Sequence, residues 1–268
     1  MARERTVVKG IVLRAVDTKE SDRILTILTP GGKLPVVAKG ARSRKSRVTA
    51  CTQLLVYAEF TLSESRGWQY LSEGNTIELF DGVRRDVGLL SLASYFAELT
   101  EAVALEDTES GEVLSLLLNA LYALGTLKKP QALVKAAFEL KLMSLTGFEP
   151  LADACACCGS PEPENPMLDL REGVVCCGKC GGPPRAAAAG PADRWSARGL
   201  SMPLSSGALA ALRHVLYGEA KRLYSFSLAA EDLKRLGDAS EAYVHATLER
   251  GFGTLDFYKG LQIQGAEG

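Results

Sequence analysis

The sequence predicts an α+β protein of several domains: a small closed β-barrel, then an all-α helical domain in which a four-cysteine element is embedded. Three observations predict it. Apolar residues alternate with polar ones or are β-branched through the first eighty residues, and they then recur at steps of three or four. Six of the seven cysteines gather between residues 150 and 204. The 268 residues suffice for one large domain or for two or three small ones.

The barrel is predicted from about five short strands. Residues 6–16 are rich in β-branched side chains, and residues 23–29 alternate apolar with polar ones. Residues 30–32, Pro-Gly-Gly, form the turn into the next strand, so this part is a β-hairpin. Segments 54–62 and 68–80 supply the remaining strands. This number of short strands without helical period fits a closed barrel better than a sandwich.

The helical domain is predicted from residue 84 onward, where the apolar period changes to 3.6. Three successive helices follow, with Ser110 a plausible N-cap of the second. The third begins after Pro130 and ends near Gly147. The same period returns in three later segments: 208–217, 228–249 and 254–261. We expect the domains to comprise residues 1–82 and 83–268, with the cysteine element at about 151–184.

The cysteine element contains two CxxC pairs separated by eighteen residues, Cys155/Cys158 and Cys177/Cys180. Each pair directs two thiolates at one tetrahedral centre, so the spacing predicts one Zn²⁺ ion. Four thiolates leave no position for water, which makes the expected zinc structural. Cys157 and Cys176 are additional, and either could replace a neighbour as a ligand. Cys51 lies in the strand region and is expected to be a small buried apolar residue.

Positive charge is concentrated at the start of the chain. Residues 1–47 contain twelve Lys and Arg against four Asp and Glu, whereas the remainder contains nineteen against twenty-eight. The stretch AKGARSRKSR, residues 38–47, has no acidic residue and follows the third strand. Its side chains could bind a phosphate backbone together with two residues on neighbouring strands. The residues predicted to bind nucleic acid are Arg14, Lys33, Lys39, Arg42, Arg44, Lys45 and Arg47. A solvated loop without a partner is the alternative.

Aromatic side chains in the barrel could stack on nucleic-acid bases or fill the core. The four candidates are Tyr57, Phe60, Trp68 and Tyr70. Catalytic patterns are missing: neither His214 nor His245 begins a zinc-hydrolase motif, and no nucleotide-binding glycine pattern occurs. These absences weigh against a hydrolase, a P-loop protein and a dinucleotide-binding enzyme. The first ten residues lack the apolar region of a secretory signal, so a cytoplasmic location is expected, without a membrane span.

The order of these parts resembles the bacterial RecO family of DNA repair and recombination mediators. The most specific segment runs from Glu20 to Thr26, followed by Gly32-Lys33 and by residues 39–42, Lys-Gly-Ala-Arg. The resemblance extends to the two CxxC pairs and to the closing segment EAYVHATLERGFGTLDFYKGL. The departures are the two extra cysteines and an alanine- and proline-rich insert at residues 183–191.

The resemblance implies that the barrel is an OB-fold and that the protein is not an enzyme. It also implies binding to single- and double-stranded DNA. It also implies annealing of complementary strands, and promotion, together with RecR, of RecA loading onto DNA coated by single-strand DNA-binding protein. The acidic, apolar C-terminal tail of that last partner would contact the helical domain, and the protein would associate with the nucleoid. Two alternatives stay open: an OB-fold RNA-binding protein, and a zinc or thiol redox protein.

Overall fold

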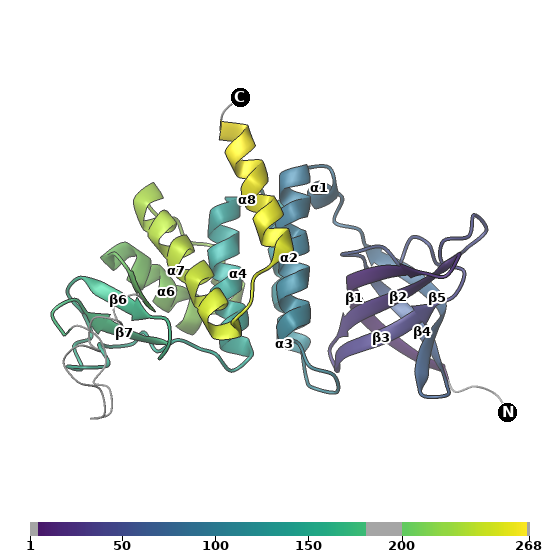
Figure 1. Cartoon of the computed structure of the whole chain (residues 1–268), viewed down its shortest axis with the longest axis horizontal. Coiled ribbons are helices and arrows are strands. Elements are labelled where there is room, and N and C mark those ends of the chain that lie inside the picture. The colour runs from purple at the N-terminus through teal and green to yellow at the C-terminus, as the bar shows by residue number, and fades with distance from the viewer. Residues whose placement is uncertain (1–4, 181–199, 267–268) are drawn as a thin grey trace. The chain divides into compact units, whose positions relative to one another are not determined.

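The chain divides into two compact units. The computed structural model describes residues 5–180 and 200–266 (Figure 1). Met1–Lys128 and Phe252–Gly268 form unit 1, and Lys129–Gly251 form unit 2. Unit 2 is therefore an insertion in the sequence of unit 1. The domain boundaries expected from the sequence stay a prediction, and the insert at residues 183–191 lies outside the described residues.

Unit 1 contains a closed five-stranded barrel with the spatial order β1-β2-β3-β5-β4. Its strands are β1 (Arg5–Thr18), β2 (Asp22–Thr29), β3 (Gly32–Ala38), β4 (Tyr57–Ser65) and β5 (Trp68–Glu78). The long β1 pairs with both β2 and β4 and so closes the barrel. The β3 and β5 strands pair in parallel, with Val37 opposite Tyr70, whereas the other neighbours are antiparallel. This arrangement confirms the predicted OB-fold.

The barrel core takes residues from the strands and from the segment between β3 and β4. Val12, Leu25 and Phe60 are fully buried, as the alternation of the strands predicts. The connecting segment adds further buried residues to the same core: Ala41, Val48, Cys51 and Val56. The chain that carries the basic stretch is therefore held against the barrel at both of its ends.

Close packing between Gly74 of β5 and Cys51 gives a testable consequence. A Cβ atom on Gly74 would overlap the Cys51 Sγ and lie 3.2 Å from the Cys51 Cβ. Gly74→Ala is expected to lower the free energy of unfolding by about 1–3 kcal/mol, because the neighbouring core is filled. Urea denaturation measures this change. The double variant Gly74→Ala/Cys51→Ala should regain part of the lost free energy of unfolding, because the smaller side chain makes room for the new Cβ atom. An equal loss in the single and the double variant would contradict this packing.

Four helices complete unit 1: α1 (Asp81–Arg84), α2 (Val87–Val103), α3 (Gly111–Gly125) and α8 (Gly253–Ala266). The Asp86 side chain caps α2 by accepting a hydrogen bond from a first-turn N–H. The α8 helix packs against α2, although about 150 residues of sequence separate them. The Tyr95 and Phe252 rings meet edge to face at 5.6 Å, and the Glu98 carboxylate accepts a hydrogen bond from the Thr254 N–H at 3.2 Å.

The predicted cap of α3 differs in detail from the observed one. Ser110 does precede the helix, but its hydroxyl donates to the Thr108 carbonyl at 2.9 Å and makes no cap hydrogen bond. Its backbone N–H instead donates to the Pro30 carbonyl at 2.7 Å, in the β2–β3 turn. Ser110 therefore ties the start of α3 to the barrel.

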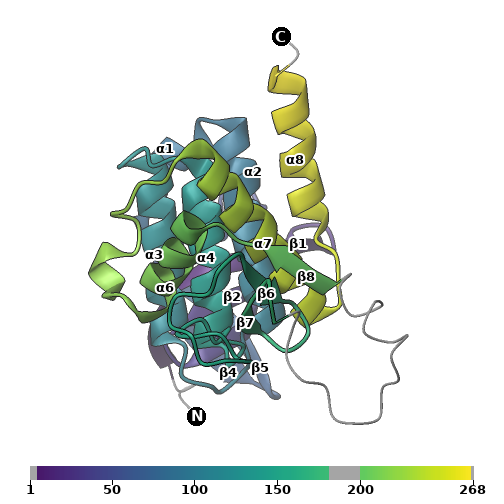
Figure 2. The ribbon, with the colours of Figure 1, turned by 90° about the vertical axis from the view of Figure 1, so that its left-hand side faces the viewer.

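Unit 2 combines helices with a small sheet. Over its described residues, 129–180 and 200–251, the elements are α4 (Gln131–Leu145), β6 (Pro166–Asp169), β7 (Val174–Cys177), β8 (Ser201–Pro203), α6 (Ser206–Tyr217), the 3₁₀ helix η2 (Ala220–Arg222) and α7 (Ala230–Leu248). The α4 helix contacts both α6 and α7. The sheet has the order β7-β6-β8, which Figure 2 shows beside these helices. Strands of three or four residues are too short to show an alternating pattern, so the sequence does not indicate this sheet.

A network of charged side chains is buried between α4 and α7. The Lys135 ammonium lies 2.8 Å from the Glu139 carboxylate and 2.9 Å from that of Glu241. The second oxygen of Glu139 accepts a hydrogen bond from the Ser240 hydroxyl at 2.6 Å. Glu139 is fully buried. Burial lowers the pKa of Lys135, but the two carboxylates outweigh this effect and raise it overall.

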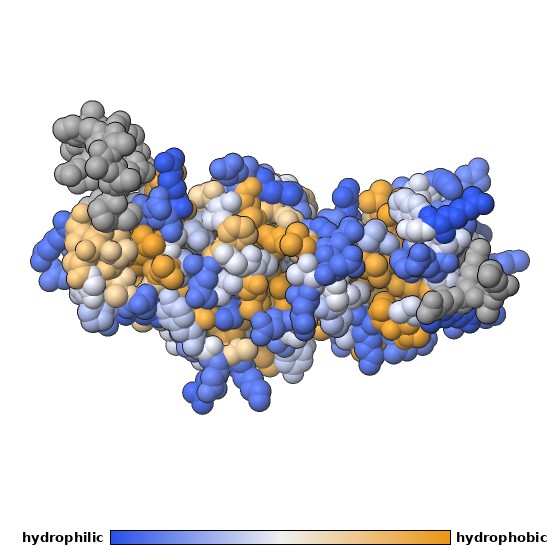
Figure 3. All heavy atoms as spheres, turned by 90° about the horizontal axis from the view of Figure 1, so that it is seen from below, coloured by the Kyte–Doolittle hydropathy of each residue, from blue (hydrophilic) through white to orange (hydrophobic). Residues whose placement is uncertain are grey.

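The surface mixes polar and apolar side chains. In the view of Figure 3, hydrophilic residues in blue alternate with apolar residues in orange over the barrel and over the helices. Among the helices that the structure describes, none combines the length and apolar character needed to span a bilayer.

Candidate nucleic-acid interface and metal centre

The basic stretch forms a compact loop, residues 39–47, which we call the basic loop. It continues from β3 through two successive turns, in which the Ser43 and Ser46 N–H groups donate to carbonyls three residues earlier. Asp22 accepts a hydrogen bond from the Gly40 N–H at 2.8 Å, and the Ser21 carbonyl accepts one from Arg42 at 2.9 Å. These bonds fix the loop beside the β1–β2 turn, so its cations are displayed from a fixed backbone.

The cations of the basic loop fall into two groups. The Arg42 Nε lies 3.2 Å from Asp17, which also pairs with Arg23 at 2.8 Å. The hydrogen bond from Arg23 and the charges of both arginines lower the pKa of Asp17. Arg44, Lys45 and Arg47 are exposed, and none of them forms an ion pair with any residue that the structure describes. These three cations are therefore available to an external anion, and Lys39, whose ammonium lies over the Tyr70 ring, is a fourth loop cation without an ion pair to a described residue.

Arg14 and Lys33 lie on the same barrel but near the helix α2. The Arg14 guanidinium lies 3.8 Å from the Glu101 carboxylate. Lys33 donates to the Glu101 carbonyl at 3.0 Å. Lys33 is the second residue of β3, and Lys39 follows the last residue of that strand. At about 3.3 Å per residue, the two lysines are roughly 20 Å apart along the strand. Of these two lysines, Lys39 therefore lies with the other cations of the basic loop, whereas Lys33 lies at the opposite end of the strand.

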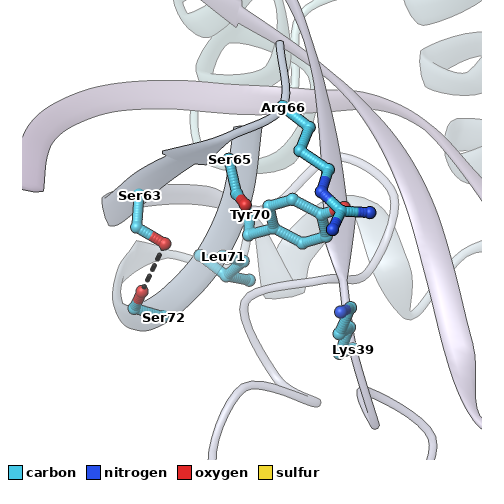
Figure 4. A pocket seen from close by; sticks show the side chains of 7 residues that line it. All are labelled: Lys39, Ser63, Ser65, Arg66, Tyr70, Leu71 and Ser72. Carbon is cyan, nitrogen blue, oxygen red and sulfur yellow. Dashed lines mark hydrogen bonds between the residues drawn. The ribbon is translucent and has the colours of Figure 1, made fainter. Parts of the chain in front are cut away.

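A pocket of about 420 Å³ opens where the β4–β5 hairpin meets the end of β3. Its lining residues, drawn in Figure 4, are Lys39, Ser63, Ser65, Arg66, Tyr70, Leu71 and Ser72. The Lys39 ammonium lies 4.6 Å from the centre of the Tyr70 ring. Arg66 and the three serines of this pocket were not identified from the sequence as functional residues. The dipeptide Arg66-Gly67 between two predicted strands was the available signal, because it indicates a hairpin turn that displays an arginine.

The four predicted stacking candidates have different positions in the structure. Phe60 is fully buried in the barrel core, and Tyr57 is half-buried. Tyr70 is half-buried beneath the Lys39 ammonium, and Trp68 has half of its surface exposed, at 50%. Trp68 is therefore the candidate whose ring is most accessible to a base.

The metal centre is built from two cysteine-containing turns beside the β6–β7 hairpin. Four sulfur atoms, those of Cys155, Cys158, Cys177 and Cys180, lie within 4.8 Å of one another. The separations are 3.9 Å from Cys155 to Cys180, 3.5 Å from Cys158 to Cys177 and 3.6 Å from Cys177 to Cys180. Thiolates bound at about 2.3 Å in a tetrahedron lie about 3.8 Å apart, so the four sulfurs fit one tetrahedral ion.

The backbone around Cys155 favours the thiolate form that a metal requires. The first turn closes with the Gly159 N–H donating to the Cys155 carbonyl at 2.8 Å, and Gly159 has a φ of +73°. The Cys177 N–H donates to the Cys155 Sγ at 3.2 Å. Burial would raise the pKa of Cys155, but N–H donors from Cys177, Cys158 and Cys157 outweigh it and lower the pKa to about 6.

The two additional cysteines lie next to the four-sulfur cluster. Cys157 and Cys176 approach each other to 3.3 Å between sulfur atoms. Together with Cys155 they form a second group of three sulfurs within 4.8 Å. Among the described residues, only the group of two CxxC pairs supplies four thiolates. This completeness favours the predicted ligands, whereas the three-sulfur group would require a fourth ligand from elsewhere.

Comparisons with known proteins agree with this arrangement. The family model described as recombination protein O N terminal matches residues 1–80, and that described as recombination protein O C terminal matches residues 84–256. A DNA repair protein RecO of Acetivibrio thermocellus is 32% identical over 253 residues, covering 94% of this chain and 95% of its own length. Another, of Symbiobacterium thermophilum, is 30% identical over 263 residues, covering 95% of this chain and 97% of its own.

A third relative with the same name, from Anaeromyxobacter dehalogenans, is 32% identical over 252 residues and covers 92% of this chain and 93% of its own. The two family models together span both the barrel and the cysteine element. The resemblance read from the sequence is thereby confirmed. The chain belongs to the recombination protein O (RecO) family of DNA repair proteins.

Proposed function

We propose that this RecO-family chain is a recombination mediator that binds single- and double-stranded DNA and anneals complementary strands. With RecR, it promotes loading of RecA onto DNA coated by single-strand DNA-binding protein. The observation that supports this most is the basic loop on the OB barrel, whose Arg44, Lys45 and Arg47 have no intramolecular ion pair among the described residues. Phosphate is the anion that such a surface fits in a DNA repair protein.

Annealing follows from charge neutralisation. Two DNA strands repel each other through their phosphates, and a cluster of cations that contacts both strands lowers that repulsion. Contacts to phosphate carry no base readout, so pairing of the two strands decides which sequences join. The binding has to stay reversible for the protein to leave the finished duplex.

Recruitment to coated DNA would use a second site. We assign contact with the acidic, apolar tail of the single-strand DNA-binding protein to the helical domain, residues 83–268, separate from the OB domain, residues 1–82. Two weak sites on one chain raise the local concentration of the protein at coated DNA. The expected location is the cytoplasm, on the nucleoid.

We propose that one Zn²⁺ ion occupies the four-cysteine centre, within an element at about residues 151–184. Tetrahedral thiolate sites take zinc or iron–sulfur clusters, and two CxxC turns are typical of zinc. Bound there, zinc would join the two turns and supply folding energy without a catalytic step.

Removing the charge of the basic loop tests the DNA-binding proposal. The variant has Arg42, Arg44, Lys45 and Arg47 all changed to alanine. For single-stranded DNA, the slope of log K against log salt concentration should be shallower in the variant than in the parent by about 2 to 3. Each lost phosphate contact accounts for about 0.7 of this difference. Arg42 counts for less because it pairs with Asp17. Fluorescence anisotropy of labelled DNA over a salt series measures this slope.

A matched control removes four exposed cations elsewhere: Lys128, Lys221, Arg222 and Lys234. It should keep the parental slope, because these residues lie outside the basic loop. Equal slopes in the parent and in the loop variant would make residues 39–47 a solvated loop. Tighter binding of the parent to RNA than to DNA of the same sequence would favour the RNA-binding alternative.

A further inference from the structure

We propose that the pocket at the β4–β5 hairpin is a nucleotide subsite specific for single-stranded DNA. Lys39 and Arg66 bind one phosphate there, and the exposed ring of Trp68 stacks on an adjacent base. This inference rests on the proposed DNA-binding function and adds a second contact region to it. The residues that carry it are outside the stretch 42–47 that displays the loop cations.

The lining of the pocket has the chemistry of an anion site. It contains two cationic side chains, three serine hydroxyls and no carboxylate. Neither Lys39 nor Arg66 forms an ion pair with a residue that the structure describes, so their charges are not neutralised. Its volume of about 420 Å³ lies within the range of about 300–1,000 Å³ for ligand pockets. A phosphate oxygen can accept hydrogen bonds from both cations and from the hydroxyls.

The two cations come from elements that pair with each other. Lys39 follows the end of β3, and β3 pairs with β5 through Val37 and Tyr70. The Tyr70 ring holds the Lys39 ammonium by a cation–π contact at 4.6 Å. Figure 4 shows Lys39 and Arg66 extending toward the space beside this ring. The strand pairing therefore sets the separation of the two charges before a ligand binds.

The backbone at Arg66 is a further indication. Arg66 and Gly67 form the two-residue turn of the hairpin, with φ values of +54° and +75°. This is the pattern of a type I′ turn, in which glycine or asparagine is favoured at positive φ. An arginine in left-handed conformation costs about 1–2 kcal/mol relative to its preferred backbone. A role for the guanidinium in binding gives this residue a reason to occupy the turn.

Stacking makes the subsite selective for single strands. Trp68 and Tyr70 are two residues apart on β5, so their side chains project to the same face of the strand. Trp68 is 50% exposed and lies immediately after the turn that carries Arg66. A base can cover this ring only when it is unpaired and unstacked from its neighbours. The other cations of the basic loop, at positions 42, 44, 45 and 47, would contact phosphates alone and have no such requirement. Loops joining strands 4 and 5 bind oligonucleotides in many OB-folds.

The test uses the fluorescence of Trp68 in the full chain. The sequence has two tryptophans, Trp68 and Trp195, so the parent carries Trp195→Phe and reports on Trp68 alone. Oligo(dT) should quench this fluorescence, whereas a duplex of equal length should not. Trp68→Ala should weaken oligo(dT) binding by about 5- to 150-fold, and Trp68→Phe should restore most of it.

Arg66→Ala tests the phosphate contact. It should reduce the salt slope for oligo(dT) by about 0.7 and leave duplex binding within about twofold of the parent. The control is Arg85→Ala, which removes another exposed arginine of unit 1 that is not part of the pocket lining. Circular dichroism melting of each variant verifies that the barrel is folded.

The outcomes separate the subsite from the general function. Unchanged oligo(dT) binding by both Trp68→Ala and Arg66→Ala overturns the subsite and leaves DNA binding intact. Equal losses on oligo(dT) and duplex overturn its selectivity for single strands. A parent that binds neither DNA overturns the proposed function itself, and with it the subsite.

Discussion

Cys158→Ala is expected to remove most of the proposed zinc ion from the four-cysteine centre and to destabilise unit 2 severely. Structural zinc contributes about 10–16 kcal/mol in small zinc-binding peptides, which is comparable to the whole stability of a typical domain. The three remaining sulfurs cannot complete a tetrahedron, so the two cysteine turns lose their common anchor. We expect less than half of the parental zinc content by mass spectrometry, and a melting temperature lower by roughly 10 °C or more.

The additional cysteines provide the matched controls. Cys157→Ala and Cys176→Ala should each retain one zinc ion per chain, because neither belongs to a CxxC pair. If zinc were lost from these two variants and kept in Cys158→Ala, the ligands would instead be the group of Cys155, Cys157 and Cys176. DNA binding should decline only with unfolding. A folded, metal-free variant that no longer bound DNA would show that the zinc is not purely structural.

Lys135→Met is expected to lower the free energy of unfolding by about 3–5 kcal/mol. The change leaves Glu139, which is fully buried, without the ammonium at 2.8 Å, and an uncompensated buried charge is strongly destabilising. Because the pKa of Lys135 is raised above its ordinary value of 10.5, the lysine stays charged at neutral pH. Its contribution is complete below that value and is lost as the pH rises through the higher pKa of the folded state. Urea denaturation at pH 7 measures the change.

Two further variants isolate the cause of this loss. Lys135→Met combined with Glu139→Leu should regain most of the stability, because the fully buried carboxylate is then removed together with its cation. Lys234→Met removes a lysine with the same spacing to Asp238 on an exposed helix face, and should cost less than about 1 kcal/mol. A loss of similar size at Lys135 and Lys234 would contradict the role of burial.

Local patterns were sufficient to predict the barrel strands and most helices. Alternation over residues 23–29 gave β2, and Pro130 correctly marked the start of α4. The CxxC pairs likewise gave the four-sulfur cluster, because each pair is fixed by its own tight turn. Features set by residues close in sequence can be read from that sequence.

Long-range pairings could not be predicted in this way. The sequence predicts Arg14 and Lys33 to be available to nucleic acid. In the structure, Arg14 lies near the Glu101 carboxylate and Lys33 donates to the Glu101 carbonyl, and Glu101 is 87 and 68 residues further along the chain. Arg66 joins Lys39 only because β3 and β5 pair in parallel. The alternation of apolar residues within one strand shows which face is buried, but it does not show which other strand pairs with it.

The insertion of unit 2 within unit 1 sets an order for folding during synthesis. The ribosome makes Lys129–Gly251 before the helix α8 and before Phe252, which directly precedes α8 and packs against Tyr95. Unit 2 can therefore reach its native state while α2 still lacks that partner. Until α8 emerges, the nascent chain presents an uncovered apolar helix face, which is the kind of surface that chaperones bind. Unit 1, whose barrel is synthesised first, is therefore the last unit to be completed.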